Sequence, residues 1–306
     1  MNILLVHDQK LPVFTYGGTE RVVWSLAKEL HEMGHQISFL LPKGSTCAFA
    51  KVYTWDTSKE INGQIPEHID VVHFQKDPQQ VINKPFIVTI HGNGNEHKEI
   101  PENYVFVSKD HANRHGSQHF VYNGLDWNDY TKPDFGMKRT HFHFLGNAAW
   151  RVKNVRGAIN IIKETPKEEL AVLGGVRFNF KMGLRFTFSP RIKFYGMVGG
   201  QQKFDLLNRS KGLIFPVLWP EPFGLALTES LFYGCPVFGT PNGSLPELIT
   251  SEFGYLSHNS SDIVEAISHV DSYDRKKCHE YARDVFNSTT MAKNYVKAYE
   301  KVLNTH

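Results

Sequence analysis

Cysteine is scarce in this sequence of 306 residues, which contains only Cys47, Cys235 and Cys278. An odd number of cysteines at such wide spacing matches neither a disulfide framework nor a zinc-binding motif. Disulfides persist mainly in oxidising compartments, so a chain without a disulfide pattern fits a reducing one. We therefore expect a cytoplasmic protein with free thiols.

Long apolar runs are missing as well. None approaches the roughly 18 residues that a membrane-spanning helix needs. The first apolar run, Ile3–Val6, has the length of a strand and follows no basic segment, so it does not resemble a signal peptide. The sequence predicts a soluble protein, for which peripheral contact at the inner face of a membrane stays open.

The sequence also lacks an excess of one charge, since 34 Lys and Arg residues face 31 Asp and Glu residues, for a net charge of +3. This near balance argues against a nucleic-acid partner, which usually requires a strongly basic surface. No Asp-x-Asp triplet is present to hold a divalent metal ion between phosphates. We expect a protein that requires neither a metal ion nor another cofactor.

What the sequence does contain is a regular alternation of strand-length apolar runs and helical apolar spacing. The strands expected in the first half are Ile3–Val6, Ile37–Leu41, Val71–Phe74, Phe86–Ile90, Tyr104–Val107 and Phe120–Tyr122. Those expected in the second half are Phe142–Leu145, Leu170–Leu173, Ile192–Tyr195, Leu213–Phe215 and Pro236–Phe238. This order predicts an α/β protein with two doubly wound, Rossmann-like parallel sheets whose ligand-binding edges face each other across a cleft.

The predicted domains are residues 1–135 and 140–285, with the polar stretch 132–139 as the linker. The tail from residue 262 onward contains no proline and reads as helical, and we expect 286–306 to pack back on the N-terminal domain. Segment 176–190 is basic and aromatic without a clear period. It is either a hairpin or flap that touches an acceptor or a membrane, or a plain loop.

Ligands of open α/β sheets bind beyond the carboxyl ends of the strands. This rule selects Gly17–Gly18, His91 and Asn123–Gly124 in the first half, and 146–153 and Glu221 in the second. The chemically unusual residues thus collect at one edge of each predicted sheet.

The strongest local pattern is Pro-Glu-Pro-Phe-Gly-Leu-Ala-Leu-Thr-Glu-Ser at 220–230. Pro222 predicts a helix start, which places Glu221 just before the helix and Glu229 about two turns inside it. Carboxylates accept hydrogen bonds from sugar hydroxyls, and the N–H groups of a helix start can bind phosphate. From spacing alone, the alternative is a helix cap at Glu221 and a solvated Glu229.

The same stretch resembles the E-x7-E motif of the retaining GT-B glycosyltransferases of family 4. The matching residues are Glu221, Phe223, Gly224, Leu225 and Glu229, followed by Gly234-Cys235-Pro236-Val237. The resemblance implies that Glu221 contacts the transferred sugar at the catalytic centre and that Glu229 binds the ribose. Because a helix N-terminus stabilises negative charge, we also expect the backbone N–H groups near Phe223, Gly224 and Leu225 to bind the donor phosphates.

The N-terminal half fits the same resemblance. Gly17, Gly18 and Thr19 are similar to the family's glycine-rich loop, which implies that Gly18 meets the donor while Gly17 and Thr19 face the acceptor. His91, in Thr-Ile-His-Gly, matches the family's catalytic histidine near the reacting carbon. The alternatives are an ordinary turn at Gly17–Gly18 and a structural histidine at position 91.

One segment departs from the family pattern. Members usually carry Gly-Arg and, about five residues later, Lys-Gly, whose cationic side chains neutralise the diphosphate. Here Asn147 occupies the Arg position, Lys153 comes one residue late, and Asn154 replaces the Gly. We expect Lys153 and Arg151 to bind the donor phosphates, with a solvated basic face as the alternative.

Taken with its motifs, the resemblance implies a hexosyltransferase-type enzyme of polysaccharide biosynthesis. It would move a sugar from a nucleoside-diphosphate sugar to a hydroxyl of a glycan or lipid-linked acceptor, with retention. A sugar-nucleotide epimerase and a non-catalytic nucleotide- or glycan-binding module remain alternatives. A nicotinamide oxidoreductase should carry G-x-G-x-x-G directly after its first strand, and Gly17–Gly18 does not fit that spacing.

Overall fold

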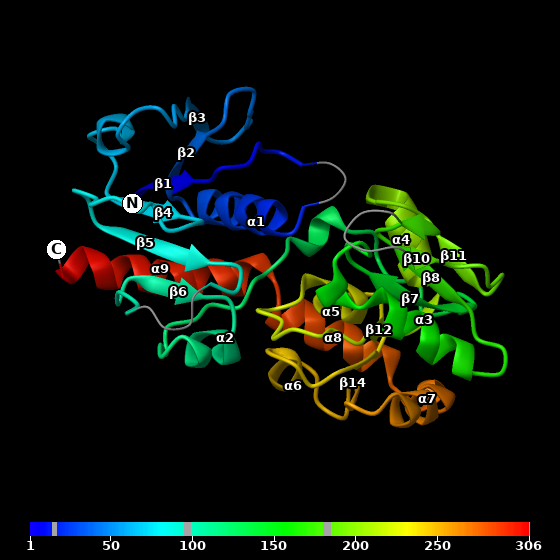
Figure 1. The fold of residues 1–306 in the computed structure, drawn as a ribbon. Coiled ribbons are helices and arrows are strands. Elements are labelled where there is room, and N and C mark those ends of the chain that lie inside the picture. The colour runs from blue at the N-terminus through cyan, green and yellow to red at the C-terminus, as the bar shows by residue number, and fades with distance from the viewer. Residues whose placement is uncertain (14–16, 95–98, 180–184, 306) are drawn as a thin grey trace. The chain divides into compact units, whose positions relative to one another are not determined.

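The structure is a computed structural model that describes all residues except 14–16, 95–98, 180–184 and 306. The chain forms two compact units (Figure 1). Unit 1 comprises residues 1–13, 17–127 and 286–306, and unit 2 comprises residues 128–285. Each unit contains a six-stranded parallel sheet of its own, as the alternation of elements predicts.

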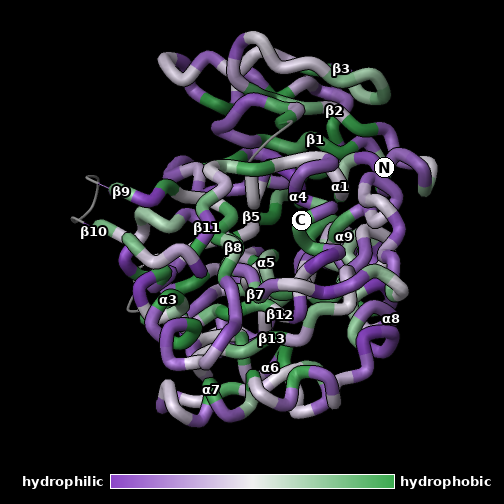
Figure 2. Tube along the Cα trace, turned by 90° about the vertical axis from the view of Figure 1, so that its right-hand side faces the viewer, coloured by the Kyte–Doolittle hydropathy of each residue, from purple (hydrophilic) through white to green (hydrophobic). Residues whose placement is uncertain are grey.

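The sheet of unit 1 has the order β3-β2-β1-β4-β5-β6. Its strands are β1 (Asn2–Val6), β2 (Gln36–Leu41), β3 (Lys51–Thr54), β4 (Val71–Phe74), β5 (Phe86–Ile90) and β6 (Tyr104–Phe106). The side chains of Ile3–Leu5 are fully buried, as expected for a strand covered on both faces, and Figure 2 shows the apolar colouring along β1. The strand predicted at Phe120–Tyr122 is wrong, because only Phe120 pairs, in an isolated bridge to Phe106.

Three α-helices are described in unit 1, namely α1 (Thr19–Glu32), α2 (Lys109–Arg114) and α9 (Ser288–Thr305). A short 3-10 turn, η1 (Asn62–Gln64), lies between β3 and β4, and a second, η2 (Trp127–Asp129), lies where the chain leaves the unit. Helix α9 packs beside α1 and against β5. The C-terminal segment of the chain is therefore part of unit 1.

A buried chain of polar side chains joins α9 to the sheet. The Tyr299 hydroxyl lies 2.8 Å from Nδ1 of His73, and Nε2 of the same ring lies 2.7 Å from Oγ1 of Thr89. The Tyr295 hydroxyl lies 2.9 Å from that Oγ1. Each polar atom thus has a partner in the interior, which is the condition under which polar groups can be buried without large cost.

The returning chain passes directly over Gly124. A Cβ atom at this position would lie 2.1 Å from the carbonyl oxygen of Asn287, so only glycine allows the approach. The Leu125 N–H donates to the Phe286 carbonyl at 3.1 Å, and the Ser288 N–H donates to the Leu125 carbonyl at 3.0 Å. The backbone at Asn123–Gly124 therefore packs against the segment that leads into α9.

The sheet of unit 2 has the order β11-β8-β7-β12-β13-β14. Its strands are β7 (His141–Leu145), β8 (Leu170–Leu173), β11 (Ile192–Phe194), β12 (Ser210–Phe215), β13 (Val237–Gly239) and β14 (Gly254–Leu256). A separate two-stranded antiparallel hairpin is formed by β9 (Phe178–Asn179) and β10 (Arg185–Phe186), within segment 176–190, for which the sequence left a hairpin, a flap and a plain loop open. The middle of that segment, 180–184, lies outside the described residues.

The helices of unit 2 surround its sheet. They are α3 (Val155–Glu164), α4 (Gly200–Asn208), α5 (Leu225–Phe232), α6 (Leu245–Leu248), α7 (Ser260–Ser268) and α8 (Arg275–Val285), with 3-10 turns η3 (Arg151–Lys153) and η4 (Val270–Ser272). The predicted helical tail is thus divided into α7, α8 and α9, the last of which belongs to unit 1.

The boundary between the units falls between Trp127 and Asn128, ahead of the linker predicted at 132–139. Residues 130–134 are held by unit 2, since the Thr131 hydroxyl lies 3.1 Å from that of Tyr233 and the Asp134 N–H donates to Oδ1 of Asn208 at 2.9 Å. A polar stretch marked the linker in the sequence, but its polar groups bond within the second unit.

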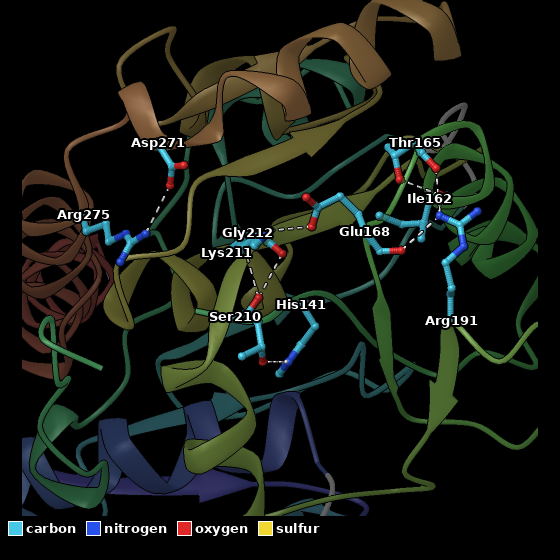
Figure 3. A network of polar contacts seen from close by, with 11 residues as sticks. His141, Ile162, Thr165, Glu168, Arg191, Ser210, Lys211, Gly212, Asp271 and Arg275 are labelled. Carbon is cyan, nitrogen blue, oxygen red and sulfur yellow. Dashed lines mark hydrogen bonds and ion pairs between the residues drawn. The ribbon is translucent and has the colours of Figure 1, made fainter. Parts of the chain in front are cut away.

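Polar contacts also hold the amino ends of the strands in unit 2 (Figure 3). Arg191, just before β11, donates from Nη1 to the carbonyls of Thr165 and Ile162 at 2.8 and 3.2 Å. These carbonyls lie at the end of α3, where a cation also complements the helix dipole. Lys211 forms an ion pair of 2.6 Å with Glu168 at the same edge. This edge is opposite to the one at which ligands of such sheets bind.

Candidate functional site

Three glycines end neighbouring strands at the carboxyl edge of unit 2. Gly146, Gly174 and Gly196 follow β7, β8 and β11, and the Gly174 N–H donates to the Gly196 carbonyl at 2.6 Å. A Cβ atom at Gly174, where φ is +120°, would lie 2.0 Å from the Gly146 carbonyl oxygen. The backbones of the three loops therefore pack directly against one another where they leave the strands.

The loop after β7 explains one departure from the family pattern. Asn154 has a φ of +54°, in the left-handed region that glycine adopts without strain and asparagine tolerates. Its Oδ1 accepts from the Gly157 N–H at 3.0 Å and its Nδ2 donates to the Pro216 carbonyl at 2.8 Å. Asn154 therefore takes over the backbone role of the usual glycine and also caps α3.

Asn147, at the usual Arg position, has a local role as well. Its Oδ1 accepts from the Ala149 N–H at 3.0 Å, and its carbonyl accepts from the Trp150 N–H at 3.0 Å. The side chain shapes the turn that leads to Lys153 and brings no charge to it.

Lys153 and Glu221, which follow the neighbouring strands β7 and β12, form an ion pair. The ammonium group of Lys153 donates to Oε1 and Oε2 of Glu221 at 2.8 and 2.6 Å. The Trp219 indole N–H donates to Oε2 at 2.7 Å, and the Lys153 ammonium lies 4.9 Å from the Trp219 ring centroid. Both charged side chains are largely shielded from solvent, which strengthens their attraction.

The turn at Asn242–Ser244 fixes the backbone of Glu221. The Ser244 N–H donates to the Glu221 carbonyl at 2.9 Å, and the Ser244 hydroxyl donates to the Phe223 carbonyl at 3.0 Å. Gly243 has a φ of +64°, and a Cβ atom there would lie 2.2 Å from the Glu221 nitrogen. The glycine in this turn is thus required by its close approach to the predicted site.

The start of α5 corrects the predicted position of the helix. Gly224 has a φ of +86°, which is not helical, so the helix begins at Leu225 and not at Pro222. Glu229 is consequently the fifth residue of α5, little more than one turn inside it. Phe223 is buried, and its position just before Gly224 leaves the first N–H groups of α5 next to the Glu221 segment.

Glu229 is buried inside unit 2, which rules out the alternative of a solvated helix residue. Its Oε1 accepts from the Lys203 ammonium at 2.5 Å and from the Tyr130 hydroxyl at 2.8 Å. The Lys203 ammonium also lies 5.3 Å from the Tyr130 ring centroid. Sequence reasoning missed Lys203 and Tyr130, because neither belongs to a motif or follows a strand.

Arg151 lies in different surroundings from those of Lys153. It lines a pocket of about 230 Å³ together with Arg156 and Arg185, and neither Lys153 nor Glu221 is among the lining residues. A second cavity, of about 350 Å³, opens beside His141 at the start of β7. Because ligands bind at the opposite ends of such strands, we do not assign the donor to this cavity.

In unit 1, His91 follows β5, and its Nε2 lies 2.8 Å from Oε1 of Gln75, which follows β4. Burial and the nearby His7 lower the pKa of His91 to about 3, so the ring is neutral at physiological pH. His7 follows β1, the next strand in the sheet. Sequence analysis missed His7 and Gln75, although the strand-end rule that selected His91 applies equally to them.

The glycine-rich loop makes local contacts at Gly17. The Gly17 carbonyl accepts from Nε of Arg21 at 2.6 Å, and a Cβ atom at Gly17 would lie 2.8 Å from Val13. Gly18 precedes α1, and Thr19 is its first residue. The three predicted loop residues thus stand at the start of a helix, beyond the carboxyl end of β1.

Among the described residues, no group of three or more His, Cys, Asp or Glu side chains is arranged to hold a metal ion. None of the described helices combines the length and the apolar character needed to cross a bilayer.

Comparison with solved structures supports the fold. AviGT4, a glycosyltransferase involved in avilamycin A biosynthesis, superposes with a TM-score of 0.78 at 20% identity, over 100% of this chain and 98% of that chain. HepE of Anabaena in complex with UDP-glucose superposes with a TM-score of 0.72 at 14% identity, over 98% and 100%. At these identities the likeness establishes a shared α/β fold of two Rossmann-like domains, the GT-B fold.

A curated relative is an uncharacterized 41.2 kDa protein in the cps region of Klebsiella pneumoniae, 28% identical over 116 residues. The match spans 36% of this chain and 32% of that protein, about a third of its length.

The family model described as glycosyl transferases group 1 matches residues 128–285, just over half of the chain. That range coincides with unit 2 as the contacts define it and holds Lys153, Glu221 and Glu229. Fold and sequence therefore agree on the same segment, and the chain belongs to the glycosyl transferases group 1 family.

Proposed function

We propose that this chain transfers a sugar, of hexose type, from a nucleoside-diphosphate donor to a hydroxyl of a glycan or lipid-linked acceptor, with retention at the anomeric carbon. The observation that carries the proposal is the ion pair between Lys153 and Glu221. It sets a cation and a carboxylate side by side at the carboxyl edge of the sheet in unit 2.

The two members of this pair have complementary tasks in such a reaction. Negative charge grows on the diphosphate as the glycosidic bond breaks, and a fixed cation such as Lys153 stabilises it. The Glu221 carboxylate can accept hydrogen bonds from sugar hydroxyls once Lys153 turns to the phosphate. Trp219 keeps one carboxylate oxygen in place at 2.7 Å throughout.

The beginning of α5 supplies further positive potential. The Leu227 N–H donates to the Gly224 carbonyl at 2.9 Å, whereas the N–H groups of Leu225 and Ala226 precede this first bonded turn and suit a phosphate oxygen. Glu229 is held by Lys203 and Tyr130, which leaves its carboxylate preoriented for the ribose hydroxyls. The assignments of His91 to the sugar, Gly18 to the donor, and Gly17 and Thr19 to the acceptor remain predictions.

Lys153 and the helix start give charge stabilisation without a metal ion, so we propose that transfer requires none. Retention would follow from attack on the face that the diphosphate leaves, with a donor phosphate oxygen accepting the proton of the acceptor hydroxyl. The relative in a cps region supports a polysaccharide as the setting.

Ligand binding provides the first test. UDP and UDP-glucose are the first probes, because HepE was solved with UDP-glucose, and GDP and GDP-mannose are the comparison. A ligand at a hundred times its Kd should stabilise the protein by about 2.7 kcal/mol in thermal unfolding. Absence of any shift with all four would contradict the proposal.

Variants then separate binding from chemistry. We expect Glu221→Gln to lower transfer about 100-fold while the nucleotide Kd changes little, and Glu229→Ala to weaken nucleotide binding about tenfold. Lys277→Met, which breaks an exposed ion pair of 3.0 Å with Glu252, is the control and should alter neither value. Unchanged kinetics in both glutamate variants would refute the site.

The products distinguish the remaining alternatives. A product whose anomeric configuration is inverted, as read by NMR, would refute retention alone. Conversion of the donor without an acceptor would indicate an epimerase. Nucleotide binding without transfer to any acceptor would indicate a binding module, an alternative that the neutral Asn147 motivates.

A further inference from the structure

The hairpin of β9 and β10 has its apolar side chains on the outside. Phe178, Phe186 and Phe188 are 45%, 50% and 80% exposed, and Val176 is 55% exposed. The residues that alternate with them, Arg185 and Thr187, are only 7% and 3% exposed. We call Val176, Phe178, Phe186 and Phe188 the aromatic face.

This arrangement reverses the usual pattern of a surface hairpin, in which apolar residues face the core and polar residues face water. Phe178 and Phe186 are direct cross-strand partners, with ring centroids 5.9 Å apart. The Phe188 ring also lies 5.9 Å from that of Phe178. Scattered exposed hydrophobic residues are ordinary, but clustered aromatic rings indicate an interaction surface.

Two arginines fix the hairpin in this orientation. Nη1 and Nη2 of Arg177 donate to the carbonyls of Thr187 and Ile192, each at 2.7 Å. Nη2 of Arg185 donates to the Val176 carbonyl at 2.7 Å, and its guanidinium lies 4.7 Å from the Phe194 ring centroid. The hairpin strands lie outside β8 and β11 in Figure 2, and the hydrogen bonds of Arg177 and Arg185 fix their backbone there.

The surroundings of the aromatic face are basic. The neighbouring pocket is lined by Arg185 and the exposed Arg151 and Arg156. Burial and the charge of Arg156 lower the pKa of Arg185, which places two cations near each other.

We propose that the aromatic face docks on a bilayer that contains anionic phospholipids. Aromatic rings favour the interface between acyl chains and headgroups, and arginines beside them attract anionic headgroups. Trp150 and Leu218, both exposed, line the same pocket as Arg156 and extend the apolar surface.

A second copy of the chain is the less suitable occupant. A symmetric dimer through this face would place the same basic surface on both sides of the interface, where like charges repel. An anionic bilayer instead offers an apolar acyl region for the aromatic rings and negatively charged headgroups for the arginines. The proposal concerns a partner of unit 2 and is independent of the donor chemistry.

Vesicle cosedimentation tests the proposal with the full chain. We expect binding to vesicles of phosphatidylcholine with about one third phosphatidylglycerol, and little binding to phosphatidylcholine alone. The double variant Phe178→Ser/Phe188→Ser should lose at least tenfold in partitioning, and Arg156→Gln about fivefold, on the anionic vesicles only.

Val81→Ser is the matched control, because Val81 is an apolar side chain that is 83% exposed and belongs to unit 1, whereas the aromatic face belongs to unit 2. It should bind like the wild type, and all variants should keep the wild-type melting temperature because the altered side chains are exposed. Equal binding of wild type to both vesicles, or full binding by the double variant, would overturn the proposal. The proposal would also be overturned if the wild type were a dimer, the double variant a monomer, and neither bound vesicles.

Discussion

Lys203 and Glu229 form an ion pair of 2.5 Å inside unit 2, where their side chains are 7% and 2% exposed. Transferring two charges out of water is costly, and their mutual attraction offsets this cost only while both are present. The Tyr130 hydroxyl, 2.8 Å from the same carboxylate oxygen, is a further hydrogen-bond partner of Glu229. The arrangement holds Glu229 in place, so its geometry depends on two residues outside the motif.

We expect Lys203→Met to lower the free energy of unfolding by about 3–5 kcal/mol, because it leaves Glu229 buried without its cation. The double variant Lys203→Met/Glu229→Gln should recover most of this loss, since no charge then remains unpaired. Urea unfolding of the two variants measures both values. Lys277→Met, which breaks an exposed ion pair with Glu252, should lower the free energy of unfolding by less than about 1 kcal/mol. If Lys203→Met lowered it by no more than Lys277→Met, the buried ion pair would not stabilise the protein.

The fold could be predicted because its signals are local. Ile3–Val6 is apolar throughout, as a strand covered on both faces must be, and β1 lies in the middle of its sheet. Lys153 and Glu221 could each be selected from the sequence because each follows the carboxyl end of a strand, although their ion pair was not predicted. Adjacent strands of a parallel sheet bring such residues together whatever their distance in sequence.

The remainder of the site depends on contacts that no local pattern encodes. The partners of Glu229 come from 26 and 99 residues away, on α4 and in the segment that enters unit 2. The helix start at Pro222 was predicted wrongly because the left-handed conformation of Gly224 delays the helix to Leu225. The close approach of Gly243 to the Glu221 backbone likewise depends on the folded chain, because the two residues lie on separate segments.

Buried histidines should make the protein sensitive to acid. Burial lowers the pKa of His73 in unit 1 and of His143 in unit 2 to about 3, whereas an unfolded histidine titrates near about 6.5. Between these values the unfolded chain binds a proton that the native protein excludes. Stability therefore falls as the pH drops below about 6.5, by up to roughly 1.4 kcal/mol per pH unit for each histidine.

Substitution of His143 tests this linkage. His143 lies 2.6 Å from the Ser210 hydroxyl and 2.8 Å from the Ser230 hydroxyl, so His143→Gln should cost stability at pH 7.5. It should also reduce the slope of stability against pH by one proton between pH values of about 6.5 and 5. Ser230→Ala removes a hydrogen bond but no titrating group, and should keep the wild-type slope. Parallel curves for His143→Gln and wild type would contradict the role of His143.

Helix α9 should stabilise unit 1 through its buried tyrosines. Tyr295→Phe removes the hydroxyl that lies 2.9 Å from Oγ1 of Thr89. Tyr299→Phe removes the hydroxyl that lies 2.8 Å from Nδ1 of His73. Each variant leaves a buried polar group with one bond fewer, at a cost of about 1–3 kcal/mol. Because the four groups form one network, the double variant should cost less than the sum of the single variants.

Hydrogen exchange can locate this effect. Amides of β4, β5 and α9 should lose protection in the Tyr295→Phe variant, while those of β7 and β12 in unit 2 keep theirs. Tyr281→Phe is the matched control, because its hydroxyl donates to the Leu248 carbonyl at 3.0 Å within unit 2. It should show the reverse distribution. Equal losses in both units from either variant would mean that the chain opens as a whole, so the return of α9 would not stabilise unit 1 separately.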